Sequence, residues 1–141
     1  MSETVPFDAA DLQKMFDASP FISALGLEVL SVTAETLEVE VRMPMIPSLE
    51  RLPESNQFHG GPIASLIDTT GDFAVGLAVG GGVPTIDLRI DYLRPAFGPY
   101  LTAHATARRV GKTIGIADVD VFGADGKLVA IGRGCYSAKR G

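Results

Sequence analysis

The residues of this chain best suited to chemistry are a Gly-Gly pair and a carboxylate that follows it in an apolar segment. Gly60 and Gly61 come directly after His59, and Asp68 lies eight residues beyond Gly60. A glycine pair that opens a helix presents the backbone N–H groups of its positive end, which stabilise negative charge. Asp68 then lies about two turns further on. We predict an anion-stabilising cradle and a carboxylate arranged around one small reacting group.

The element that must position these residues is a long helix from Pro62 to about Val79. Pro62 fits the first turn, where its missing N–H costs nothing. One side is apolar and the other is small and sparsely polar, which is typical of a buried helix. The glycines at 80–82 end it. The apolar side has helical periodicity and consists of Ile63, Leu66, Ile67, Thr70, Ala74, Leu77 and Ala78.

The rest of the chain predicts one short helix and six strands. Asp8 to Phe16 has helical spacing and ends before Pro20, whereas residues 44–58 contain Pro44, Pro47 and Pro53 and predict a loop. Strands are expected where residues alternate or form short apolar runs between turns, at 27–32, 37–43, 86–92, 101–108, 113–122 and 128–137.

Two of the turns and one irregularity can also be predicted. The first hairpin turns near Ala34-Glu35, and Asp125-Gly126 joins the last two strands. Within 113–122 the apolar phase changes between Ile116 and Val119, which indicates a bulge or a strand buried on both faces.

These elements predict one α+β domain over residues 1–141, with a long helix packed against an antiparallel sheet. A single helix covers a sheet poorly from end to end. We therefore expect the other face or an edge of the sheet to contact a second subunit, so that the protein is a homo-oligomer.

Composition argues against several partners. A net charge of −5 disfavours nucleic acids and anionic membranes. No apolar run reaches the roughly 18 residues that span a bilayer, and Met1-Ser2-Glu3-Thr4 lacks the basic start of a signal peptide. The only cysteine, Cys135, cannot form an internal disulfide, which is typical of a reducing compartment. We expect a cytoplasmic protein.

Other catalytic chemistries have little support. Cys135 lies in the middle of a predicted strand, and the Gly-x-Ser-x-Gly motif of serine hydrolases is absent. His59 and His104 are the only histidines and lack the paired spacing of metal ligands. The glycines at 80–82 lack the lysine and serine of a phosphate-binding loop. We predict neither a metal site nor a bound cofactor.

The candidate residues also have simpler interpretations. Asp68 is either a polar residue on an incompletely buried face or a functional carboxylate, which we favour because burying an unpaired charge is costly. Asp72, one turn on, either repels Asp68 or faces solvent. A lone histidine before a helix is more often a capping or orienting group than a base. Gly60 and Gly61 could serve only a turn that needs positive φ.

Residues 59–68 resemble the H-G-G-x4-L-x-D motif of the PaaI-like branch of hotdog-fold acyl-CoA thioesterases. Residues 87–96 are similar to the D-x-x-I-x-Y-x-x-P-A strand of this branch, and residues 111–113 and 125–132 also match it. The resemblance covers the chain from about Phe21. It implies a long central helix wrapped by a curved antiparallel sheet. The implied reaction is hydrolysis of an acyl-CoA, of aryl or phenylacetyl type among the options, without a cofactor besides the coenzyme A of the substrate.

The resemblance also implies roles for individual residues. Gly60 donates its N–H to the thioester carbonyl, Asp68 of the partner subunit acts as nucleophile or general base, and Thr85 helps place the water. His59, the histidine of the motif, is implied to belong to the same set of catalytic residues. The branch often has an asparagine six residues before this histidine, where the chain has Pro53, and Asn56 is the candidate replacement.

Substrate contacts are expected at Gly61 and at the Val110-Gly111 turn. The acidic chain needs a local basic cluster to bind CoA phosphates, and Arg109 and Lys112 flank that turn. The alternative is a solvated strand end. The C-terminal half also offers Arg108, Lys139 and Arg140 as candidates for this cluster.

Two other functions remain open. One is a module that binds an acyl-CoA or an aromatic acid without turnover, although binding alone requires neither Asp68 nor Gly60. The other is a hotdog dehydratase, which needs a histidine–acid pair acting on a β-carbon. The acyl group is also open, because Phe58, Phe73 and Leu77 either line an apolar slot or belong to the core.

Overall fold

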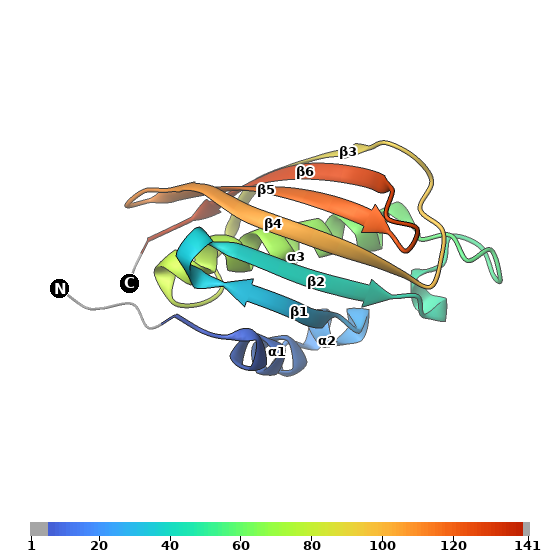
Figure 1. The fold of residues 1–141 in the computed structure, drawn as a ribbon, viewed down its shortest axis with the longest axis horizontal. Coiled ribbons are helices and arrows are strands. Elements are labelled where there is room, and N and C mark those ends of the chain that lie inside the picture. The colour runs from blue at the N-terminus through green and yellow to red at the C-terminus, as the bar shows by residue number, and fades with distance from the viewer. Residues whose placement is uncertain (1–5, 140–141) are drawn as a thin grey trace.

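A computed structural model describes residues 6–139; the N-terminal Met1-Ser2-Glu3-Thr4 and Arg140 lie outside the described residues. The domain has two layers, a six-stranded antiparallel sheet and a long helix, α3 (Gly60–Val79), behind it (Figure 1). Two short helices lie beside the first strand, where α1 (Ala9–Ala18) packs against it. This confirms the α+β class and the hotdog arrangement that the resemblance implies.

All six predicted strands form, and the sheet has the order β1-β2-β4-β5-β6-β3. Both β3 and β1 are edge strands, and each pairs with one neighbour in the sheet. The strands are β1 (Glu28–Thr33), β2 (Glu38–Pro44), β3 (Thr85–Tyr92), β4 (Tyr100–Val110), β5 (Ile114–Gly123) and β6 (Leu128–Ser137).

The ends of α3 follow from local sequence. His59 is the N-cap residue, so the helix begins two residues before the predicted Pro62. At the other end Gly80 adopts φ 108°, in the left-handed region that glycine tolerates, and its N–H donates to the Gly76 carbonyl at 2.7 Å.

Small residues allow the sheet to approach α3 closely. A Cβ atom at Gly115 of β5 would lie 2.5 Å from Val75 Cγ1 of the helix. One at Gly132 of β6 would lie 2.5 Å from Ile67 Cγ2. Branched side chains of the helix therefore fill the space that these strands leave open.

The predicted irregularity is present near Ile116 in the pairing of β5 with β4, but β5 itself is regular there. Gly115, Ala117, Val119 and Val121 are all buried, in unbroken alternation, and the register with β6 is continuous from Ile114 to Val121. The small residues face the helix and the isoleucines face away, so hydrophobicity alone misleads here. The irregularity belongs to the neighbouring strand β4, between Ala107 and Arg109.

The N-terminal region contains one more helix than predicted. The first helix, α1, is capped by Asp8, which exchanges side-chain to backbone hydrogen bonds with Asp11 at 2.8 and 3.1 Å. A second, α2 (Pro20–Leu25), begins at the proline that was expected only to end the first. Proline is well tolerated in the first turn of a helix.

By length and composition, α3 is apolar enough to cross a membrane, but most of it is buried inside the domain. The ring of Phe73 contacts those of Phe7 and Phe16, with centroids 6.1 and 5.4 Å apart. Leu77 is 4% exposed. The helix is thus the centre of the core, and Phe73 and Leu77 are core residues rather than the walls of an open slot.

Candidate active site

Asp68 projects from the middle of α3 toward the start of β3. The Thr85 hydroxyl donates to Asp68 Oδ1 at 2.7 Å, so the two predicted residues are in direct contact. Asp68 is half-buried. Asp68 therefore lies on an incompletely buried face, as its simpler interpretation states, but it is not unpaired.

Tyr136 of β6 fixes the helix backbone at the same point. This side chain is completely buried, and its hydroxyl donates to the main-chain oxygen of Asp68 at 3.0 Å. Its ring occupies space that two glycines leave open, because a Cβ at Gly71 or Gly134 would lie 2.5 or 2.3 Å from the hydroxyl oxygen.

Asp72 points to the same side as Asp68. Its Oδ1 accepts a hydrogen bond from the Val83 N–H at 2.8 Å, just before β3 begins. Burial raises the pKa of Asp72 to about 7 and the nearby charge of Asp68 adds to this, whereas the Val83 hydrogen bond opposes it. Asp72 therefore does not face solvent freely.

The N-terminus of α3 presents one unused donor. His59 Nδ1 accepts from the Gly61 N–H at 3.3 Å, which caps the helix. The Tyr92 hydroxyl donates to the Gly60 carbonyl at 2.8 Å. Within residues 6–139 the Gly60 N–H has no hydrogen-bond partner. It is free to bind an oxygen of a ligand.

A cavity of about 430 Å³ lies beside Gly60. Apolar residues supply much of its wall, and two arginines reach it from the flanking loops. In the described part of the chain, neither arginine forms an ion pair. The residues that line this cavity include Arg51, Phe58, Gly60, Ile63, Tyr92 and Arg94.

Gly60 and Asp68 do not meet within one chain. Eight residues of α-helix span about 12 Å, so a carbonyl bound at the Gly60 N–H lies far from the carboxylate of the same helix. Among the described residues, no hydrogen bond joins Asn56 to Gly60 or Asp68. Asn56 is exposed, with φ 58°, and its N–H donates to Glu50 Oε2 at 2.8 Å.

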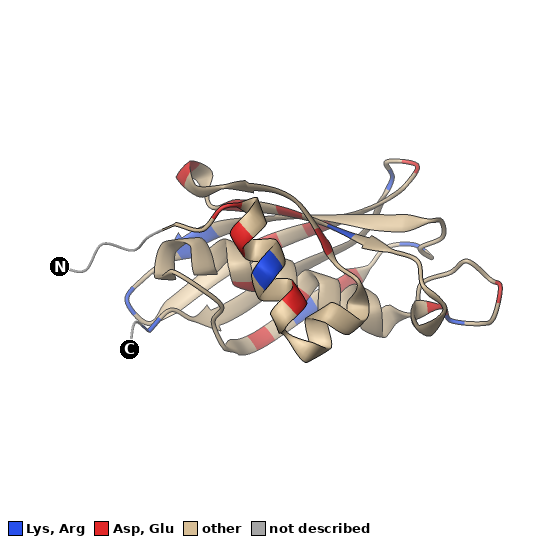
Figure 2. Cartoon of the chain, turned by 90° about the horizontal axis from the view of Figure 1, so that it is seen from below, with Lys and Arg blue, Asp and Glu red and all other residues tan. Residues whose placement is uncertain are grey.

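The basic turn of Arg109 and Lys112 lies at the opposite end of the domain from Gly60. Figure 1 shows the β4–β5 turn at one end of the sheet and the loop before α3 at the other. Gly115, just after the turn, contacts Val75, and fifteen helical residues from Gly60 to Val75 span about 22 Å. Figure 2 shows Lys and Arg at both ends of the molecule.

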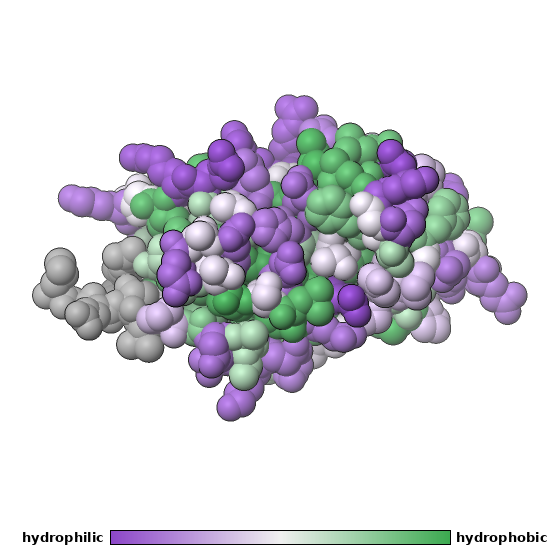
Figure 3. Space-filling model, in the orientation of Figure 1, coloured by the Kyte–Doolittle hydropathy of each residue, from purple (hydrophilic) through white to green (hydrophobic). Residues whose placement is uncertain are grey.

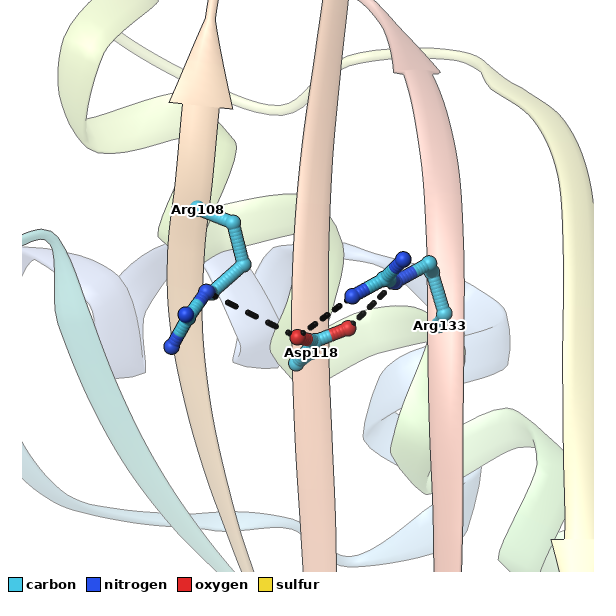
Figure 4. A network of polar contacts seen from close by, with 3 residues as sticks. All are labelled: Arg108, Asp118 and Arg133. Carbon is cyan, nitrogen blue, oxygen red and sulfur yellow. Dashed lines mark hydrogen bonds and ion pairs between the residues drawn. The ribbon is translucent and has the colours of Figure 1, made fainter.

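A second hollow, of about 590 Å³, lies on the face of the sheet away from α3. Asp118 at its floor is bonded by Arg133, with Nε–Oδ1 2.6 Å and Nη2–Oδ2 2.9 Å, and Arg108 Nε lies 3.7 Å from Oδ2 (Figure 4). The hydrogen bond from Arg133 holds the pKa of Asp118 below its usual range. This face mixes hydrophilic and hydrophobic residues (Figure 3). Asp118 is thus paired with arginines, and the sheet separates it from α3 and Asp68.

Comparison with known proteins identifies the family. The family model described as the thioesterase superfamily matches residues 56–130, which include Gly60, Asp68 and Thr85. The chain belongs to the thioesterase superfamily. It is a PaaI-like thioester hydrolase with the hotdog fold.

Individual relatives agree with this assignment. A Halobacterium salinarum protein, provisionally named an esterase, is 38% identical over 95% of this chain and 97% of its own. The acyl-coenzyme A thioesterase PaaI of Escherichia coli is 33% identical over 85% and 83%. Its structure, described as from the phenylacetic acid degradation operon, aligns with a TM-score of 0.77 at 28% identity over 91% and 90%. The medium/long-chain acyl-CoA thioesterase YigI of Salmonella typhimurium is 29% identical over 83% and 84%.

Sequence reasoning missed three contacts around the two halves of this site. Tyr92 and Tyr136 each bond a main-chain carbonyl of α3, and Asp72 bonds Val83. Tyr92 had a signal, since it lies in the motif of residues 87–96. Tyr136 had none, because Gly71, which makes room for its ring, and the Asp68 carbonyl that it bonds are both distant in sequence. Asp72 was visible only as a second acid.

Proposed function

We propose that this protein hydrolyses acyl-CoA to a carboxylic acid and free coenzyme A, at sites shared between two copies of the chain. One observation carries the proposal. A free N–H and a carboxylate held by a hydroxyl project from the same helix, about 12 Å apart. Each group alone is half of a thioester-hydrolysing site, and a second, antiparallel copy would complete it.

The proposed reaction begins when the thioester oxygen binds the Gly60 N–H. Asp68 of the other copy then removes a proton from water, whose oxygen attacks the carbonyl carbon, or Asp68 attacks that carbon itself. In either case negative charge grows on the carbonyl oxygen, where the N–H and the helix N-terminus stabilise it. The carbon–sulfur bond breaks, coenzyme A leaves as the thiolate and takes up a proton, and the acid is released. If Asp68 attacks directly, water then hydrolyses the anhydride that it forms.

Thr85 is proposed to orient Asp68. Its hydroxyl occupies one lone pair of Oδ1, which limits the rotation of the carboxylate. A carboxylate held in one orientation reacts faster because less freedom is lost in reaching the transition state. His59 and Asn56 are proposed to act further back, His59 by capping the helix that carries Gly60 and Asn56 by shaping the loop before it.

The exposed edge of β3 supports an assembly of two copies. Ile86 and Tyr92 on this strand are 53% and 52% exposed. An exposed edge strand pairs readily with another strand. Antiparallel pairing of β3 with its copy would extend the sheet and place two α3 helices side by side in opposite directions.

For the acyl group we propose an aryl or phenylacetyl type. The cavity beside Gly60, at about 430 Å³, is at the small end of ligand pockets. Its apolar wall includes Phe58 and Ile63, which suits a compact aromatic group better than a long chain. The relative PaaI supports this choice, and YigI makes a longer chain the competing case. We propose a cytoplasmic location, and the chemistry requires no cofactor beyond the coenzyme A of the substrate.

The direct test is thiol release from phenylacetyl-, short-chain and long-chain acyl-CoA by the wild type and Asp68→Asn. We expect kcat to fall by at least about 100-fold in the variant, because the shape is kept and the base or nucleophile is lost. Circular dichroism serves as the control for folding. A folded and fully active Asp68→Asn enzyme would remove Asp68 from the mechanism. Binding without thiol release would indicate a binding module, and an enoyl absorbance change a dehydratase.

Mixing two inactive variants tests the shared site. Gly60→Pro removes the N–H at a helix position that accepts proline, and the added Cβ lies at least 3.5 Å from Tyr92. Gly60→Ala keeps the N–H and is the matched control. If subunits of Gly60→Pro and Asp68→Asn exchange freely into dimers, half of the dimers are mixed and each has one intact site. About one quarter of wild-type activity should therefore return. No recovery after proven subunit exchange would show that each site lies within one chain.

A further inference from the structure

Two carboxylates of α3 bond the same short segment. Asp72 Oδ1 accepts from the Val83 N–H at 2.8 Å, and Asp68 Oδ1 accepts from the Thr85 hydroxyl at 2.7 Å. Val83 and Thr85 are separated only by Pro84. The two acids are one helical turn apart, so their side chains lie on the same face of the helix. The segment that presents Thr85 to Asp68 is therefore fixed at its other end by Asp72.

The surroundings of Asp72 contain no cation among the described residues. The titratable groups that act on it are Asp68 on its own helix and Tyr136 on β6, while the segment before β3 contributes the Val83 N–H. The ion pairs of the described chain all lie elsewhere. Burial raises the pKa of Tyr136, which keeps its hydroxyl neutral. Asp68 and Asp72 thus form a like-charge pair without a counter-ion.

We propose that Asp72 is a positioning residue for Asp68. It holds residues 83–85 so that Thr85 meets Asp68, and its own negative charge favours the movement of charge away from Asp68 during the reaction. The proposal rests on the proposed function, in which Asp68 is the reacting carboxylate. Nothing in it requires Asp72 to touch the substrate.

The electrostatic part holds for either role of Asp68. A general base becomes neutral as it takes a proton, and a nucleophile passes its charge to the carbonyl oxygen. In both cases the negative charge on Asp68 decreases toward the transition state. A like charge one turn away therefore destabilises the ionised ground state more than the transition state, which lowers the barrier.

This arrangement predicts a step in activity near neutral pH. The pKa of Asp72 is raised to about 7, so the second charge is present above pH 7 and absent below it. We expect kcat to rise roughly two- to five-fold as pH increases through this region, because solvent screens the interaction and only part of the change in basicity reaches the rate.

Three variants separate the two parts of the proposal, with kcat for acyl-CoA measured between pH 5.5 and 9. Asp72→Asn keeps an oxygen for the Val83 N–H and removes the charge, so the step should vanish while KM changes little. Asp72→Ala also releases Val83, and its kcat should fall several-fold below that of Asp72→Asn at every pH. Asp120→Asn makes the same charge change on an exposed residue of β5 and should keep the step.

The two parts of the proposal can each be overturned by a different result. A step that persists unchanged in Asp72→Asn would overturn the electrostatic part, and equal kcat in Asp72→Ala and Asp72→Asn would overturn the holding part. If the variants fail to fold, carbon-13 NMR of the wild-type carboxyl groups gives the answer. The Asp72 signal should titrate near pH 7 and the Asp68 signal should shift in the same step. An Asp68 signal that does not change while Asp72 titrates would overturn the coupling between the two carboxylates. Absence of thiol release by the wild type would instead refute the proposed function, and the NMR result would still stand.

Discussion

The two sides of the sheet shift the pKa of a carboxylate in opposite directions. On the open face, Asp118 is bonded by Arg133 and approached by Arg108, and the Arg133 hydrogen bond lowers its pKa (Figure 4). On the helix side, Asp72 is half-buried beside another acid, with no cation near it among the described residues, and this burial raises its pKa to about 7. The first arrangement favours the charged form and the second disfavours it.

The difference separates a surface contact from a candidate functional site. Exposed ion pairs such as that of Asp118 contribute little to stability and are common on solvated faces. A buried acid without a cation is costly to keep, and groups with raised pKa values concentrate where a protein performs chemistry. By this criterion the Asp68–Asp72 pair of α3 is more informative than the larger hollow on the open face.

The largest expected effect is an opposite pH dependence of stability at Asp72 and Asp118. Because the pKa of Asp72 is raised from 3.8 to about 7 in the folded protein, the folded state binds more protons than the unfolded state between these values. Ionisation of Asp72 therefore costs stability as pH rises through this window, up to about 4 kcal/mol. Asp72→Asn removes that cost, so the variant should gain on the wild type between pH 4.5 and pH 8.

Asp118 provides the matched substitution. Its pKa is lowered, so its contribution is present at neutral pH and is lost as pH falls below about 4. Asp118→Asn should cost at most about 1 kcal/mol at pH 8, because the side chain is 37% exposed. Urea unfolding at both pH values measures all of these differences. An Asp72→Asn protein that is no more stable than the wild type at pH 8 would contradict the contrast between the two faces.

A smaller effect is expected at Thr85, which bonds Asp68 through a neutral hydroxyl rather than a charge. Thr85→Val keeps the shape and removes the hydrogen bond, so kcat should fall about 3- to 10-fold. Thr85→Ser should retain most of the activity. Thr106→Val makes the same change on the open face and should leave kcat unchanged. A similar loss in both valine variants would show a general effect on the sheet rather than a role beside Asp68.

Much of the fold could be predicted from local patterns, while long-range contacts could not. The six strands and α3 follow from periodicity, and the turn at Asp125-Gly126 from residue type. The pattern failed in β5, because Gly115 and Ala117 face the helix where large residues were expected. The requirement for small residues there comes from Val75, forty positions earlier, and only the folded chain shows it.

The candidate site shows the same limit. The family resemblance placed Gly60, Asp68 and Thr85 in one group, and the Thr85–Asp68 contact is present. The roughly 12 Å between Gly60 and Asp68 is a consequence of helix geometry, so the proposed sharing of the site between two copies could be expected from the sequence. The hydrogen bonds that Tyr136 and Asp72 form could not be expected from the sequence. Nothing in the local sequence indicates that these side chains contact the backbone of Asp68 and Val83.

The smallest expected effect concerns Arg109, which has no ion pair in the described chain, in contrast to Arg133. An unpaired guanidinium is available to a phosphate, and a paired one is not. Val75, which contacts the strand after this turn, is seven residues from Asp68, about 10 Å along the helix. The turn thus lies beyond Asp68, the carboxylate proposed to react, in the direction in which the nucleotide end of coenzyme A could extend. We expect Arg109→Ala to raise KM for acyl-CoA several-fold, to leave kcat nearly unchanged, and to weaken the salt dependence of KM.

Arg133→Ala is the matched control and should change none of these. Neither variant should differ from wild type on a simple acyl thioester that lacks the nucleotide. Equal losses on both substrates would show that Arg109 supports the fold. If Arg94→Ala raises KM and Arg109→Ala does not, the phosphates of coenzyme A bind beside the Gly60 cavity instead.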